Sequence, residues 1–173
     1  MKDKITFRGV EYSIAHLAPM QFNCPCRVLG RDLIIVADFA NHRYTRNFDP
    51  VLHDHGDIVH YDNPMRPRVF CLDRYALSAH LPGIVTTLPT KKVKQTFEGR
   101  NYVFSTTVGI GATIYDIFFM LQRSSVAAGT DLRLTVESAY SPANARRKTA
   151  GAIRFVILAH HVYVGKRIKF SPR

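Results

Sequence analysis

The sequence predicts an α+β domain in which one main helical segment accompanies a strongly bent antiparallel sheet. Residues 114–121 form an almost continuous apolar run rich in aromatic and β-branched side chains, which is typical of a strand covered on both faces. After a polar break, residues 132–136 alternate apolar with polar side chains, as expected for a strand with one buried face. About nine strands and one helical segment, at about residues 73–88, indicate the α+β class. Closure of the bent sheet into a barrel is one alternative.

Length and composition predict a single domain spanning residues 1–173. The chain has 46% hydrophobic residues, with eleven Phe and eight Tyr to fill a core. No run approaches the roughly 18 apolar residues that a membrane span needs, and the first four residues lead into a strand-like segment where a signal peptide would need an apolar helix. We therefore expect a cytoplasmic protein with no membrane partner. The cysteine count of three, with Cys24 and Cys26 too close for an ordinary bridge, argues against a disulfide framework.

The N-terminal part of the chain predicts a hairpin, a buried strand and a loop, in that order. Residues 5–14 read as two short strands that turn near Gly9, and residues 33–39 form a second buried strand. Residues 41–46 follow this strand as a polar segment. Residues 47–67 are rich in Pro, Gly, Asp and His and have no lasting period, so they predict a long surface loop.

The helical segment is predicted to begin at Asp73 as its N-cap, with apolar residues recurring at i, i+3 and i+4. Pro82 lies inside that pattern and favours a division into two short helices, because an internal proline removes a hydrogen bond. Two strands flanking residues 98–101 form a hairpin, and residues 153–164 are predicted as a strand.

Charge is the strongest compositional signal. Twenty-four Lys and Arg against thirteen Asp and Glu give a net charge of +11, which favours polyanionic partners such as nucleic acid. No acidic residue follows Glu137, whereas eight cations do. A basic surface kept only for solubility is the alternative. The predicted nucleic-acid-binding residues are Arg43, Arg46, Arg74, Arg146, Arg147, Lys148, Lys166, Arg167 and Lys169.

Several chemical motifs are absent or incomplete. The chain has no phosphate-binding G-x-x-x-x-G-K-[ST] loop, and no serine lies in a G-x-S-x-G nucleophile elbow. Metal-ligand types do occur, but C-x-C and H-x-H have no second pair at a zinc-finger interval. We therefore assign no metal and no cofactor, and keep a metal site as an alternative at His53, Asp54, His55, Asp57 and His60, with Cys24 and Cys26 as further ligands.

Three segments carry the residue types that metal-free RNA cleavage needs, namely a base, an acid and cations for the phosphorane charge. His42 is the predicted general base or acid, and Glu137 is predicted to orient His42 or Arg74. Tyr75 and Tyr140 are predicted to position the substrate or to protonate the leaving group, and the three arginines Arg43, Arg46 and Arg74 to hold the phosphate.

Two other interpretations of these segments stay open. Aromatic side chains beside arginines also stack unpaired bases, which plain RNA binding would use. Alternatively, the tyrosines are core rings with their hydroxyl groups at the surface.

The same segments resemble a family of small uncharacterised bacterial proteins, often found in mobile-element neighbourhoods and sometimes given growth-adaptation or toxin-like labels. The resemblance rests on residues 39–45, residues 74–78 with Leu81 and Pro82, residues 115–119 and residues 136–140, and it extends over most of the chain. It implies a toxin or defence role and assigns no chemical role to any residue.

We therefore expect a basic RNA-acting protein, in the first instance a metal-independent endoribonuclease of toxin or phage-defence type. The alternatives are a non-catalytic nucleic-acid-binding accessory protein, and a protein-binding module for an acidic partner such as an antitoxin.

Overall fold

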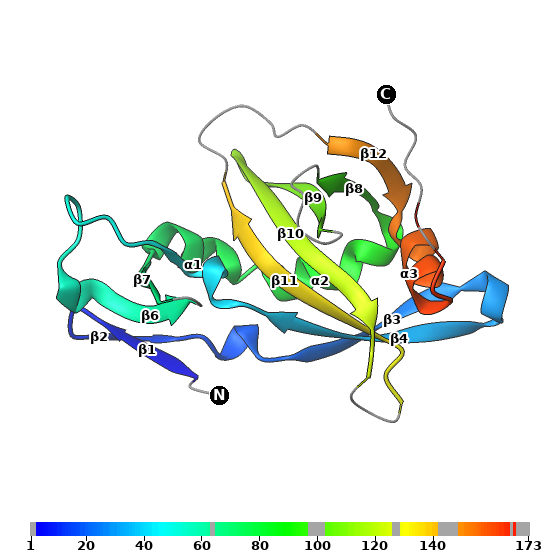
Figure 1. Cartoon of the computed structure of the whole chain (residues 1–173), viewed down its shortest axis with the longest axis horizontal. Helices are drawn as coiled ribbons and strands as arrows, with labels where there is room; N and C mark the ends of the chain where they lie inside the picture. The colour runs from blue at the N-terminus through cyan, green and yellow to red at the C-terminus, as the bar shows by residue number, and fades with distance from the viewer. Residues whose placement is uncertain are drawn as a thin grey trace.

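The computed structural model describes residues 3–62, 65–96, 103–125, 129–141, 149–166 and 168. It contains a seven-stranded sheet, a three-stranded sheet and a two-stranded hairpin, accompanied by short helices (Figure 1). The predicted α+β class is confirmed.

The seven-stranded sheet has the order β12-β8-β9-β10-β11-β4-β3, so β12 and β3 are its edges and it does not close into a barrel. Its strand direction turns strongly between the β10-β11 pair and the β3-β4 pair (Figure 1). Neighbouring strands are antiparallel except β4 and β11, which run parallel, so the expected purely antiparallel sheet is wrong at that one pair. The strand bounds are β3 Met20–Cys26, β4 Arg31–Phe39, β8 Lys92–Thr96, β9 Val103–Ile110, β10 Thr113–Arg123, β11 Leu132–Tyr140 and β12 Thr149–Arg154.

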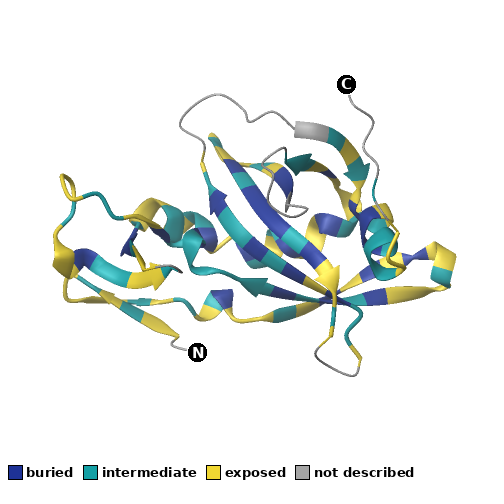
Figure 2. Ribbon diagram, viewed as in Figure 1, coloured by how far each residue is buried: buried dark blue, intermediate teal, exposed yellow. Residues whose placement is uncertain are grey.

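The core lies against this sheet, and β10 is central to it, as its apolar run predicts. Tyr115, Ile117 and Phe119 of β10 are each at most 1% exposed. Figure 2 shows buried positions recurring along β10, β11 and β4. The antiparallel pairing of β10 with β11 is also confirmed.

The predicted helical segment is present and divides into α1 (Leu72–Ser78) and α2 (Leu81–Thr87). Pro82 lies in the first turn of α2, where its missing N–H would have had no helical partner. The proline therefore marks the start of the second helix.

A third helix, α3 (Phe155–Tyr163), contradicts the strand predicted for residues 153–164. Phe155, Leu158 and Ala159 recur at i, i+3 and i+4 and are fully buried, so a helix buries one face of this apolar run. A short apolar run does not by itself distinguish a strand from a buried helix. Among the helices that the structure describes, none is long and apolar enough to cross a membrane.

The smaller sheet corrects the loop predicted for residues 47–67. Its strands are β5 (Thr45–Asn47), β7 (Arg66–Phe70) and β6 (Ile58–Asp62), in that spatial order. The predicted N-terminal hairpin is confirmed as β1 (Lys4–Phe7) and β2 (Val10–Ser13), turning through Arg8 and Gly9 at positive φ. In the smaller sheet the polar Thr45 and Arg68 are buried together with the apolar Val69 and Phe70, so the regular apolar period that marks a strand is missing.

Candidate functional site

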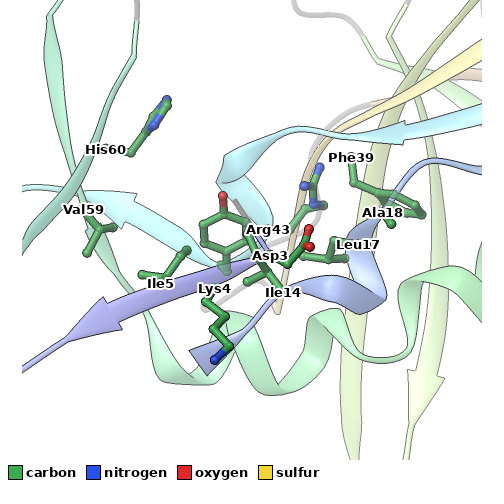
Figure 3. A pocket seen from close by; sticks show the side chains of 11 residues that line it. Asp3, Lys4, Ile5, Ile14, Leu17, Ala18, Phe39, Arg43, Val59 and His60 are labelled. Atoms are coloured by element: carbon green, nitrogen blue, oxygen red, sulfur yellow. The ribbon is translucent and has the colours of Figure 1, made fainter. Parts of the chain in front are cut away.

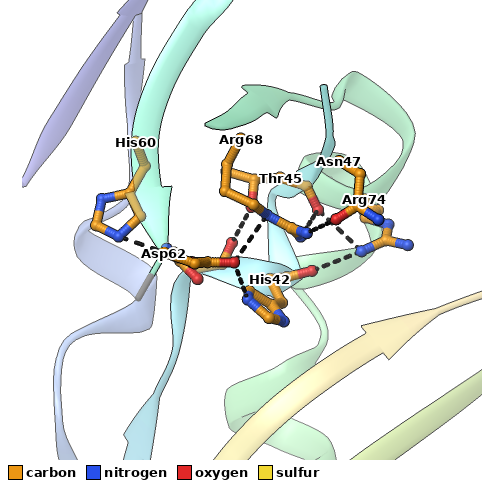
Figure 4. A network of polar contacts seen from close by, with 8 residues as sticks. His42, Thr45, Asn47, His60, Asp62, Arg68 and Arg74 are labelled. Carbon is orange, nitrogen blue, oxygen red and sulfur yellow. Dashed lines mark hydrogen bonds and ion pairs between the residues drawn. The ribbon is translucent and has the colours of Figure 1, made fainter. Parts of the chain in front are cut away.

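A polar network lies where the 3₁₀ helix η3 (Asn41–Arg43), which follows β4, meets β6 and β7 (Figure 4). The Asp62 carboxylate at the end of β6 is its centre. Asp62 Oδ2 lies 2.7 Å from His42 Nε2, and Asp62 Oδ1 accepts a hydrogen bond of 2.9 Å from Asn41 Nδ2. One carboxylate therefore positions the predicted base.

A second imidazole lies on the other side of this carboxylate. His60 Nε2 is 3.9 Å from Asp62 Oδ1. The side chains of His42, His60 and Asp62 are 37%, 51% and 18% exposed. Two imidazoles that solvent reaches thus flank one largely covered carboxylate.

The electrostatics keep His42 neutral and Asp62 ionised. Burial lowers the pKa of His42, the Arg68 cation lowers it further, and these effects outweigh the opposing influence of Asp62. Burial by itself raises the pKa of Asp62, but hydrogen bonds from Asn41 and His42 bring the pKa below its usual value. Because an ionised carboxylate only accepts, His42 Nε2 donates to Asp62 and Nδ1 keeps its lone pair. This is the tautomer that a general base needs.

Arg68 holds the network together from β7. Its side chain is buried, its Nε lies 3.5 Å from Asp62 Oδ2, and the same Nε donates to Thr45 Oγ1 at 3.2 Å. Its Nη2 donates to the Thr45 carbonyl at 3.1 Å, and its Nη1 donates to Asn47 Oδ1. Arg68 therefore links β7 to β5 and contributes a positive charge beside His42.

Arg74 of α1 joins two segments that the sequence predicted to be functional. Its Nη1 donates to the carbonyls of His42 at 2.9 Å and Thr45 at 2.8 Å. Its guanidinium carbon lies 5.2 Å from the centroid of the Tyr140 ring, which stacks on Phe118 at 5.4 Å. The structure thus brings Arg74 and Tyr140 to the backbone of His42.

Glu137 lies at a β-bulge of β11. Val136 is opposite Phe119 and Ser138 is opposite Phe118, so Glu137 is the extra residue between them. A bulge of this kind redirects a side chain. The Glu137 charge acts on both His42 and Arg43, which places it in the same electrostatic neighbourhood.

Other predicted site residues have structural roles or lie elsewhere. The Tyr75 hydroxyl donates to the Ser13 carbonyl at 2.9 Å, so its proton fastens α1 to the N-terminal hairpin. Arg43 is only 2% exposed, so little of its side chain is open to the phosphate that it is predicted to hold. Arg46 is exposed on β5.

The predicted C-terminal basic residues are placed only in part. Lys166 is exposed just after α3, which lies at the opposite end of the seven-stranded sheet from β6 and β7 (Figure 1). The remaining residues lie outside the described part of the chain, namely Arg146, Arg147, Lys148, Arg167 and Lys169.

The alternative metal ligands are engaged in other contacts. Cys24 and Cys26 are buried in the apolar core, and burial raises the pKa of Cys24 to about 12, so it remains a thiol. Asp57 pairs with Arg8 at 2.7 Å, and His53 Nδ1 accepts from the Asp49 backbone N–H at 2.9 Å. Across the described ranges, no three His, Cys, Asp or Glu side chains come together as a metal site.

Sequence reasoning missed Asp62 and Arg68, and it considered His60 only as a metal ligand. All three lie on the β6-β7 hairpin, where His60 is opposite Arg68. The signal was present as alternating charges, with His60 and Asp62 two residues apart and Arg66 and Arg68 two residues apart. Residues 47–67 were interpreted as a loop, so the two-residue spacing that places His60 and Asp62 on one face of a strand was not recognised.

The family model of the YjaZ family matches residues 4–163, and the chain belongs to this family. The match extends over most of the chain, as the resemblance in its motif segments implied. No curated protein and no solved structure matches the chain. The mobile-element and toxin associations stay predictions.

Proposed function

We propose that this protein acts on RNA as a metal-independent endoribonuclease in which His42 is the general base. The observation that carries the proposal is the His42–Asp62 pair, a half-buried, neutral imidazole oriented by an ionised carboxylate at 2.7 Å. Such a pair takes up a proton near neutral pH without a metal ion.

In this reaction His42 Nδ1 removes the proton from a ribose 2′-hydroxyl, and the 2′-oxygen forms a bond to the adjacent phosphorus. The bond from phosphorus to the 5′-oxygen breaks, which gives a 2′,3′-cyclic phosphate and a 5′-hydroxyl end. His60, on the other side of Asp62, is a second imidazole at the site and supplies the leaving-group proton.

Positive charge near the site also favours RNA, a polyanion, as the substrate. Arg46 is exposed on β5 and available to a phosphate, and Arg68 places a further cation beside His42. The net charge of +11 favours approach of a polyanion over the whole surface. In this proposal the protein works in the cytoplasm, as a toxin or defence factor restrained by an acidic partner such as an antitoxin.

A non-catalytic nucleic-acid-binding protein is the second candidate. One predicted catalytic side chain favours it, because the Tyr75 hydroxyl is bonded to the Ser13 carbonyl. Under this candidate, Arg46 and the other exposed cations bind phosphates while the His42–Asp62 pair serves only to fold η3 onto β6.

The test is cleavage of a single-stranded RNA by purified protein in the presence of a chelator. His42→Gln keeps a donor for Asp62 but has no base, so the rate should fall about 10²–10⁴-fold while RNA affinity is unchanged. Asp62→Asn and His60→Gln should also slow cleavage, and His80→Gln is the matched control because His80 is exposed elsewhere.

The two candidates give different results. Wild-type protein that binds RNA with a steep salt dependence, releases counterions and cuts nothing would establish the binding candidate. Cleavage that survives His42→Gln would contradict the proposed mechanism.

A further inference from the structure

A cavity of about 280 Å³ lies between the N-terminal hairpin, the 3₁₀ helix η1 (Ala15–Leu17), the end of η3 and β6 (Figure 3). Of its lining residues, only His60 also belongs to the polar network around Asp62. Most of the lining is apolar or aromatic, from Ile5, Ile14, Leu17, Phe39, Tyr44 and Val59. The cavity is therefore a second site beside the His42–Asp62 pair, and it shares His60 with the proposed RNA-cleaving site.

Arg43 lines this cavity as a buried cation without a counter-ion. Its side chain makes one long hydrogen bond, from Nη1 to the Val136 carbonyl at 3.4 Å, and its Nε has no hydrogen-bond partner. Within the described residues, no acidic oxygen lies within ion-pair distance of its guanidinium. The rings of Phe39 at 5.2 Å and Tyr44 at 5.9 Å lie against it, and the charges of Glu137 and Asp38 act on it only from beyond ion-pair distance.

A buried guanidinium without an ion pair is energetically unfavourable. Burial lowers the pKa of Arg43 to about 9, which reflects the cost of keeping its charge away from water. A buried charge is normally paired and hydrogen-bonded, and the planar guanidinium fits a carboxylate in particular. An anion that can enter an apolar space would therefore complement this guanidinium.

We propose that this cavity binds a small organic monocarboxylate, with its carboxylate on Arg43 and its apolar body against the aliphatic and aromatic lining. The volume lies just below the usual range for ligand sites, which favours a small ligand over a nucleotide. Lys4 adds positive charge to the lining, although it is paired with Glu11 at 3.1 Å. Asp3 is the one acidic lining residue and opposes an anion.

The test is calorimetric titration of the full chain with matched probes. Octanoate and phenylacetate carry the carboxylate on an alkyl or an aromatic body, 1-octanol keeps the alkyl body without the charge, and inorganic phosphate keeps the charge without the body. We expect at least one carboxylate to bind and both octanol and phosphate to bind much more weakly. Whichever carboxylate binds identifies the shape of the natural ligand.

Two variants distinguish the contribution of the Arg43 charge from that of the cavity volume. Arg43→Met removes the unpaired cation and should weaken carboxylate binding about 10- to 100-fold, as expected for charge-assisted hydrogen bonds. Val59→Trp fills the cavity and should abolish binding while Arg43 is intact. Arg46→Met, at an exposed cation of β5, is the control and should bind normally.

Asp3→Asn removes the opposing charge and should bind the carboxylate more tightly. Failure of both carboxylates to bind, equal affinity for octanol and octanoate, or unchanged binding in Arg43→Met would each overturn the proposal. RNA cleavage does not use Arg43, so these outcomes leave the proposed function untouched.

Discussion

The seven-stranded sheet and the three-stranded sheet are stabilised by different interactions. The larger sheet buries a continuous apolar cluster that includes Phe104, Phe119 and Leu134. In the smaller sheet, the buried positions include Thr45 and Arg68, which hydrogen-bond to each other. Among the described residues, few polar groups lie in the apolar core, where the buried Tyr115 hydroxyl is one without a hydrogen-bond partner, whereas the polar region carries the acceptor Nδ1 of His42 and the unpaired Nε of Arg43. The candidate chemistry therefore lies in the part of the fold that hydrogen bonds hold.

The largest expected effect is a loss of stability on truncating a side chain in the apolar core of the seven-stranded sheet. Phe119 is fully buried in β10, with its ring 6.0 Å from both Phe104 and Phe155. Phe119→Ala leaves a cavity between the sheet and α3, so the free energy of unfolding should fall by about 3–5 kcal/mol. The measurement is urea denaturation, with Ile157→Ala as control because Ile157 is 44% exposed on α3. A loss below about 1 kcal/mol would mean that this core can collapse around the deletion.

A smaller and more local effect is expected in the polar region. Arg68→Met keeps most of the volume but removes the donor to Asn47 and one of the two donors to the Thr45 carbonyl, since Arg74 still donates there, and this loss of charge-assisted hydrogen bonds should cost about 1–3 kcal/mol. Hydrogen exchange should show amides of β5, β6 and β7 opening faster while those of β10 and β11 stay protected.

Arg66→Met is the matched control for that experiment, because Arg66 lies on the same strand and is exposed. If Arg68→Met raises exchange equally in both sheets, the smaller sheet does not open as a separate unit. The distinction between the two regions would then be one of composition only.

The difference between apolar packing and hydrogen bonding also determines which elements the sequence could predict. The strands β10 and β11 and the helices α1 and α2 follow from apolar periods, since burial against one core dictates those periods. The run containing α3 was assigned to the wrong class because its apolar residues satisfy both periods over a short length. Strand β6 was missed because its charged residues are paired with one another, and pairing removes the need for an apolar face.

The sequence predicted which types of residue form the candidate site, but not which of those residues contact one another. His42, Arg74 and Tyr140 do come together, because β4 and β11 run parallel with Phe39 opposite Val136 and so end side by side. Nothing local in either strand specifies that pairing, which joins segments almost a hundred residues apart. Asp62, which orients His42, lies in the stretch whose strand was not recognised.

The smallest expected effect is the dependence of stability on pH. The folded protein lowers the pKa of His42 below the usual value of about 6.5, so the unfolded chain binds its proton more readily. By linkage, stability should be greatest above pH 6.5 and should fall as the pH drops from there toward the folded pKa of His42. Burial lowers the pKa of His16 and of His161 as well, so both add to the fall with the same sign.

Melting curves between pH 8 and pH 5 test whether the polar region carries this dependence. His42→Gln removes one titrating group but keeps a donor for Asp62, so its melting temperature should fall less on acidification than that of the wild type. His80→Gln, at an exposed position, should follow the wild type. Asp62 also has a lowered pKa, but a carboxylate loses its contribution only as the pH falls below its unfolded value of about 3.9, outside this window. Parallel curves for the wild type and His42→Gln would mean that His42 has the same proton affinity in the folded and unfolded chains, and would remove the electrostatic basis for its role as a base.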